Sequence, residues 1–239
     1  MVEKALQKIG MERYSLIKDK FPREFVLLQG KGCKWRQCTF CDYHTDTSDQ
    51  PFEVNKAVLE QVTGQYQVLD IINSGSGYEL DDDTIMLIRK IVAEKHIHTL
   101  WFEMHYMYKN RLQDFARLFH PTTVKFRCGI ETFSPTLRNN WKKGVPSHVT
   151  ALDLSKHFQG ICLLCGTDTE GDTRQRILED IALAEEYFEY YSINLFCPNS
   201  TNVRRNEAIA QWFMDTVYPT IIKSNKAEIL INNTDLGVG

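Results

Sequence analysis

Three cysteines within nine residues constrain this chain more than any other feature. Cys33, Cys38 and Cys41 come shortly after the apolar residues 25–28. Three thiolates on one loop can hold three irons of a cubane [4Fe-4S] cluster and leave the fourth iron open for a ligand. The same cysteines together with His44 could form a Cys3His zinc site, because zinc accepts closely spaced sulfur and nitrogen ligands.

Composition and charge exclude several classes of protein. The chain has 239 residues, 43% of them apolar, and a formal net charge of -3 with its basic residues dispersed. Direct nucleic-acid binding is therefore not expected. The start has no apolar signal region and no segment approaches the roughly 18 to 20 apolar residues needed to span a bilayer, which predicts a cytoplasmic protein without membrane contact. We expect the four other cysteines to be packed thiols, at Cys128, Cys162, Cys165 and Cys197.

Apolar segments alternate with helical patterns along most of the chain. Strands are predicted at residues 25–29, 68–73, 98–104, 124–130, 160–165 and 192–197. Between and after them, i, i+3, i+4 apolar spacing predicts helices at 54–66, 82–95, 109–119, 147–158, 173–190 and 204–223. Repeated strand–helix units are typical of an α/β fold with a parallel sheet.

The cysteine motif, with Phe40 before its last cysteine, resembles that of the radical S-adenosylmethionine (radical SAM) superfamily. Four residues separate Cys33 from Cys38, whereas the commonest form of the motif has three. The resemblance implies an open (βα)6 partial barrel of the TIM-like type, which six units fit better than a full barrel of about 250 residues. We expect one domain over residues 1–239, with a helical lead-in at 1–22 and a C-terminal segment at 224–239 near the barrel mouth.

The same resemblance implies contacts to S-adenosylmethionine (SAM). Ser74, Gly75 and Ser76 occupy the place of the glycine-rich motif that binds the methionine amino group. Glu131 corresponds to a residue that contacts the ribose or amine, and Lys143 to a basic residue that pairs with the carboxylate. A tight turn, a surface charge or an ordinary core strand would explain the same residues without a ligand. The remaining predicted cofactor contacts are Phe40, Tyr43, Ile161 and Leu163.

Polar side chains gather where the strands are predicted to end, which is where barrel enzymes carry their active sites. Amides and carboxylates supply the paired donors and acceptors that a heterocyclic edge requires. Glu103 and His105 are also candidates for a catalytic acid or base, although loop capping would account for any one of these residues. The predicted substrate contacts are Glu103, His105, Tyr106, Asn199, Asn232 and Asp235.

Over its whole length the chain is similar to a compact bacterial group of radical SAM proteins that includes queuine lyases. The resemblance implies a [4Fe-4S] cluster and SAM as cofactors, reductive cleavage of SAM, and use of the 5'-deoxyadenosyl radical on a small substrate. The queuine lyases of this group cleave queuine, a 7-deazaguanine, to 7-aminomethyl-7-deazaguanine (preQ1) in queuosine salvage for transfer RNA, and the resemblance implies this reaction as the most similar one. A reductant protein such as flavodoxin or ferredoxin is implied as well. A radical SAM reaction on another small metabolite and a Cys3His zinc-bound binding module remain as alternatives.

Overall fold

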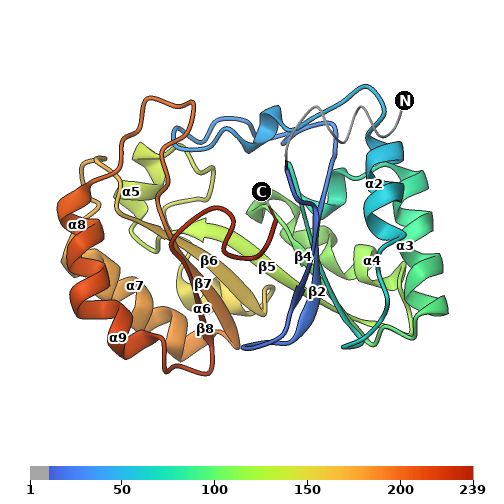
Figure 1. Ribbon diagram of the computed structural model, residues 1–239. Helices are drawn as coiled ribbons and strands as arrows, with labels where there is room; N and C mark the ends of the chain where they lie inside the picture. Colours follow the sequence, from blue (N-terminus) through green and yellow to red (C-terminus); the bar gives the residue numbers. More distant parts are fainter. Residues whose placement is uncertain (1–10, 239) are drawn as a thin grey trace.

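One sheet organises the chain. The computed structural model describes residues 11–238. Its eight strands pair in sequence order; β1 runs antiparallel to β2, and all the following pairs are parallel (Figure 1). The strands are β1 Tyr14–Ile17, β2 Arg23–Leu28, β3 Val68–Asn73, β4 Thr99–Glu103, β5 Thr123–Glu131, β6 Gly160–Cys165, β7 Tyr190–Leu195 and β8 Ala227–Leu230.

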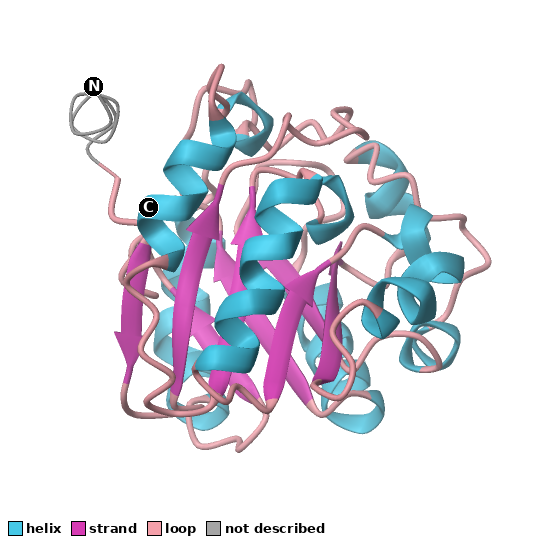
Figure 2. Cartoon of the chain, turned by 90° about the vertical axis from the view of Figure 1, so that its right-hand side faces the viewer, coloured by secondary structure: helices cyan, strands magenta, loops and turns pink. Residues whose placement is uncertain are grey.

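The helices fill the connections between the parallel strands, as the sequence predicts for βα units (Figure 2). Several begin at side chains that accept a backbone N–H: Asp81 caps α3, Thr150 caps α6 and Thr173 caps α7. The helices are α2 Pro51–Leu59, α3 Asp82–Glu94, α4 Leu112–Arg117, α5 Pro135–Asn140, α6 Ala151–Ser155, α7 Arg174–Tyr187, α8 Glu207–Trp212 and α9 Tyr218–Ile221.

The predicted α/β partial barrel is confirmed, with three corrections at the level of elements. Part of the expected helical lead-in is strand β1, which adds an antiparallel edge to β2, and residues 1–10 lie outside the described residues. The expected helix at 204–223 is interrupted by a π-helical turn, Phe213–Val217, just before Pro219. Proline lacks the N–H that would continue the helical ladder. Helix α5 was not expected, although Ser134 and Pro135 form a typical helix start.

The two faces of the sheet differ in chemistry. Outward-facing side chains such as Val26, Ile71, Phe102 and Ile161 are buried in the main apolar core with the helices. On the inward face, Arg23 of β2 reaches Glu228 of β8 at 2.7 Å. These strands lie at opposite ends of the parallel part of the sheet, so the sheet must curl to bring them together.

The C-terminal segment joins the two edges of this curled sheet. After β8 the chain turns at residues 231–235 and runs toward β1 and β2, as the red segment in Figure 1 shows. Ser15 donates a hydrogen bond to the carbonyl of Leu236, and Val238 packs with Phe25 and Leu27 of β2. Among the described helices, none has both the length and the apolar character needed to cross a membrane.

Candidate active site at the C-terminal ends of the strands

The three motif cysteines lie on the loop that follows β2. All three are free thiols with partly exposed side chains. Burial raises the pKa of Cys38 and raises that of Cys41 to about 12, whereas the nearby charge of Lys143 opposes both shifts. Cys33 influences the pKa of Cys38, and Cys38 that of Cys41, so the loop brings the thiols into one neighbourhood.

Loops from the far side of the barrel hold the cysteine loop in place. The loop after β5 supplies two carbonyl acceptors and the loop after β7 supplies one amide donor, each to a residue near a cysteine. A loop anchored at several points presents its ligands in a fixed arrangement, as a cluster site requires. The bonds are Trp35 Nε1 to Lys142 O at 2.7 Å, Thr39 N to Trp141 O at 3.1 Å and Asn199 Nδ2 to Phe40 O at 2.7 Å.

The glycine-rich loop after β3 lies against the cysteine loop. A Cβ atom added to Gly75 would come within 2.9 Å of Cys33 Cα, so only glycine allows the two backbones to approach this closely. Ser74 Oγ accepts from Gly30 N at 3.2 Å, and Ser76 Oγ accepts from His105 N at 3.0 Å. The predicted SAM-binding segment therefore also connects the loops after β2, β3 and β4.

Glu131 and Lys143 form a buried ion pair beneath the cysteine loop. Lys143 Nζ lies 2.8 Å from Glu131 Oε1, and each side chain is about 10% exposed. Burial disfavours the ammonium, but Glu131 and the nearby Cys38 and Cys128 together hold the pKa of Lys143 well above its usual value. Glu131 adopts a left-handed backbone with φ of 66°, which is strained for a residue with a side chain and is common at functional sites.

His105 fixes the loop that carries Lys143. Its Nε2 lies 2.8 Å from Lys143 O, its Nδ1 accepts from Met107 N at 3.2 Å, and its ring stacks on Trp35. Burial and the charge of Lys143 lower the pKa of His105 to about 4, so the ring is neutral near pH 7. Since both nitrogens are engaged, His105 serves to position Lys143 and has no free nitrogen for acid–base chemistry.

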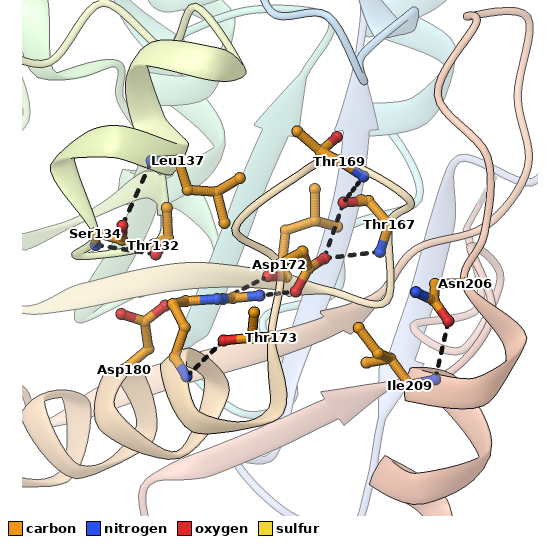
Figure 3. A network of polar contacts seen from close by, with 12 residues as sticks. Thr132, Ser134, Leu137, Thr167, Thr169, Asp172, Thr173, Asp180, Asn206 and Ile209 are labelled. Atoms are coloured by element: carbon orange, nitrogen blue, oxygen red, sulfur yellow. Dashed lines mark hydrogen bonds and ion pairs between the residues drawn. The ribbon is translucent and has the colours of Figure 1, made fainter.

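Polar contacts also fix the loops after β5 and β6 (Figure 3). Asp172 accepts hydrogen bonds from Thr167 N at 2.7 Å and from Thr167 Oγ1 at 2.9 Å. Arg176 links Asp172 to Asp180, and Asp180 accepts from Phe133 N at 2.9 Å just after β5. The turn between β6 and α7 is thus tied to the strand that ends in Glu131.

Several predicted site residues have structural roles instead. Ile161 and Leu163 point into the outer core, away from the inward face, because side chains alternate along β6. Tyr106 is also a core residue, and its hydroxyl accepts a hydrogen bond from Lys109 at 2.7 Å. Only the backbone of these three residues could approach a ligand on the inward face.

Three other predicted substrate residues form hydrogen bonds with nearby parts of the chain. Asn199 binds the cysteine loop and Thr201, which places it near the predicted cluster ligands. Asn232 and Asp235 are exposed, and Asp235 caps the turn that follows β8. Glu103 remains as the predicted substrate residue on the inward face, where its side chain is 35% exposed. Enclosure by the barrel wall raises the pKa of Glu103, and Arg127 opposes the shift.

The polar residues on the inward face were not predicted from the sequence. Arg127 donates to both oxygens of Asp70, at 2.8 and 2.6 Å, and the Oδ1 atom of Asn194 is buried without a hydrogen-bond partner among residues 11–238. The available signal was a charged or amide residue inside an otherwise apolar strand, as in Val68–Asn73.

Solved structures similar to this chain include two radical SAM enzymes. The sequence matches no family model and no curated protein. It is 39% identical to queuine lyase from Clostridium spiroforme bound to SAM and queuine, over 96% of this chain and 100% of that chain, with a TM-score of 0.90. The chain belongs to the queuine lyase family of radical SAM enzymes. Streptococcus suis SuiB, bound to its precursor peptide SuiA, shares the fold at 14% identity and a TM-score of 0.56, over 97% of this chain and 52% of SuiB.

Radical SAM enzymes use a [4Fe-4S] cluster and SAM, and the residues present fit both groups. The motif cysteines are free and partly exposed, and Cys38 and Cys41 lie close to the cation of Lys143. No three His, Cys, Asp or Glu side chains in the described part of the chain converge as they would around one metal ion. A cubane binds each thiolate through a different iron and needs a wider arrangement of ligands. The opposite charges of Glu131 and Lys143 suit the zwitterionic end of SAM.

Proposed function

We propose that this radical SAM enzyme cleaves queuine to 7-aminomethyl-7-deazaguanine. The observation that carries the proposal is the 39% identity over nearly the whole of both chains to a queuine lyase bound to SAM and queuine. We place the reaction in queuosine salvage in the cytoplasm, because its product serves transfer RNA modification. Cell fractionation would check the location.

Each part of the site has a proposed role. Cys33, Cys38 and Cys41 hold the cluster, and Phe40 and Tyr43 line it. The bound cluster and SAM supply abstraction of a hydrogen atom from the substrate. The protein provides binding, orientation and exclusion of water.

Ser74, Gly75, Ser76, Glu131 and Lys143 are proposed to hold the methionine end of SAM. Lys143 would turn from Glu131 to the carboxylate of SAM, while Glu131 would accept from the amine or the ribose. His105 supports this arrangement through its 2.8 Å contact with the carbonyl of Lys143.

Replacing Lys143 by alanine should weaken SAM binding about ten- to a hundredfold, because a charge-assisted contact contributes roughly 1.5 to 3 kcal/mol. Calorimetry on anaerobically prepared protein measures the change. Lys142→Ala is a suitable control, since Lys142 is exposed and only its backbone carbonyl contacts the cysteine loop. Equal SAM affinity in wild type and Lys143→Ala would remove Lys143 from the cofactor site.

Anaerobic turnover with SAM, dithionite and queuine tests the proposed function directly. Mass spectrometry should detect 7-aminomethyl-7-deazaguanine together with 5'-deoxyadenosine, with formation of both dependent on queuine. Formation of 5'-deoxyadenosine at the same rate with and without queuine, from protein with an intact cluster, would reject queuine as the substrate. It would favour another small metabolite.

We also propose that a small acidic reductant protein, such as flavodoxin or ferredoxin, delivers the electron at the cysteine loop. Lys31, Lys34, Arg36 and Lys142 are exposed around this loop and form no ion pair with residues 11–238. The chain as a whole is negative, so this positive surface is local. Cluster reduction by flavodoxin should slow steeply as salt increases, whereas reduction by dithionite should not show this steep loss.

A further inference from the structure

A chain of alternating charges crosses the inward face of the curled sheet. Arg127 lies 3.7 Å from Glu103 and bonds both oxygens of Asp70. Arg23 donates to Asp70 at 2.9 Å and reaches Glu228 with two further bonds of 3.2 and 2.7 Å. The chain of charges thus connects β4, β5, β3, β2 and β8.

Glu103 differs from the other members because its side chain is accessible. It is 35% exposed, whereas the side chains of Asp70, Arg127 and Arg23 are 2 to 4% exposed and that of Glu228 is 11% exposed. Glu103 Oε2 faces Arg127, and Glu103 Oε1 has no hydrogen-bond partner among residues 11–238. Oε1 can therefore receive a ligand. Oε2 lies 3.7 Å from Arg127 Nε and 4.0 Å from Cys162 Sγ, and because each carboxylate oxygen has two acceptor sites, it can accept from a ligand as well.

The position of Glu103 places this free oxygen next to the proposed SAM site. A Cβ atom added to Gly129 would lie 3.2 Å from Glu103 Oε1 and 3.3 Å from Lys143 Nζ. The other carboxylates nearby have partners, because Glu131 binds Lys143 and Asp70 lies between two arginines. Glu103 is thus the acidic group on this face with capacity for a substrate.

We propose that Glu103 is the specificity-determining residue that reads the ring N–H and exocyclic amine of the 7-deazaguanine base, and that Arg127 and Asp70 position its carboxylate. The assignment rests on the proposed function and goes beyond it by naming the edge of the base that is recognised. The two adjacent donors of a guanine-type edge match the two acceptor oxygens of one carboxylate. A site built this way rejects a base that lacks one donor, because a polar atom is then left unpaired.

The test compares two free bases, 7-deazaguanine and 7-deazahypoxanthine, which differ only in the exocyclic amine. Calorimetry on the SAM-loaded holoenzyme should show about ten- to a hundredfold tighter binding of 7-deazaguanine by wild type. Glu103→Gln has the same shape but replaces one acceptor oxygen by a donor, so this preference should fall to within about threefold. Unchanged preference in Glu103→Gln would overturn the proposal.

Two further variants separate recognition from general damage. Glu228→Gln alters the opposite end of the same charge chain and should keep the preference for 7-deazaguanine. Arg127→Lys keeps the charge but loses the planar fork, so it should reduce the preference while SAM affinity stays at the wild-type level. Loss of the preference in Glu228→Gln would mean that the charge chain acts through stability, which contradicts a specific role for Glu103.

The binding measurement also separates this proposal from the proposed function. Preference for 7-deazaguanine that depends on Glu103, in an enzyme that does not cleave queuine, would retain the recognition site and reject the reaction. Cleavage of queuine by an enzyme whose base preference ignores Glu103 would retain the reaction and reject the site.

Discussion

Replacing Cys38 by alanine should leave the protein without a [4Fe-4S] cluster. Two remaining thiolates on the loop, Cys33 and Cys41, hold a cubane poorly because each protein ligand secures a separate iron. We expect iron and acid-labile sulfide to fall to background, with loss of the brown colour and of SAM cleavage. Iron and sulfide analysis after anaerobic reconstitution measures the effect without relying on activity.

Cys128→Ala is the matched control for this experiment. Cys128 lies on β5 and is fully buried in the outer core, on the face of the sheet opposite the site. The change removes one thiol from the chain and should leave the cluster content unchanged. A Cys38→Ala protein with wild-type iron and sulfide would contradict the assignment of the cysteine loop as the cluster site.

Replacing Arg127 by methionine should lower the free energy of unfolding by about 3 to 5 kcal/mol. The side chain of Arg127 is 4% exposed, and that of Asp70, which it bonds twice, is 2% exposed. Although burial disfavours the charged guanidinium, Asp70 together with Tyr190 and Cys162 holds the pKa of Arg127 well above its usual value. Removing the arginine leaves Asp70 buried with Arg23 as its remaining partner.

Urea denaturation of the anaerobically purified protein measures this loss. Arg117→Met provides the comparison, because Arg117 pairs with Asp114 on the exposed surface of α4 and should contribute at most about 1 kcal/mol. Equal unfolding midpoints for the two variants would show that the inward charge chain contributes no more to stability than a surface ion pair.

The sequence by itself determined the class of chemistry and the frame of the fold. The cysteine spacing around Phe40 is a local property of one loop, so its meaning does not depend on distant contacts. The six βα strands were also predictable, since β-branched and apolar runs between turn residues are local signals as well. The positions of Glu131 and Lys143 followed from the resemblance, and the structure shows the two residues as a pair.

Only the tertiary structure decided which side chains face the site. Ile161 and Leu163 were expected at the cofactor, but alternation along β6 turns them to the outer core. The sequence of a strand predicts that neighbouring side chains point to opposite faces of the sheet. When both faces are buried, it does not predict which of them becomes the inside of the barrel.

The chain of charges on the inward face could not be predicted from local sequence patterns either. Arg127 meets Asp70 across 57 positions, and Arg23 meets Glu228 across 205 positions. These ion-pair partners meet because the sheet curls and brings β2 close to β8. Asn232 and Asp235 lie on an exposed turn after β8, where Asp235 accepts from Asn232 N, and their contact with substrate stays a prediction. The sequence therefore located the cysteine loop. The curvature of the sheet decided that Glu103 is the accessible carboxylate on the inward face and that the buried charges lie beside it.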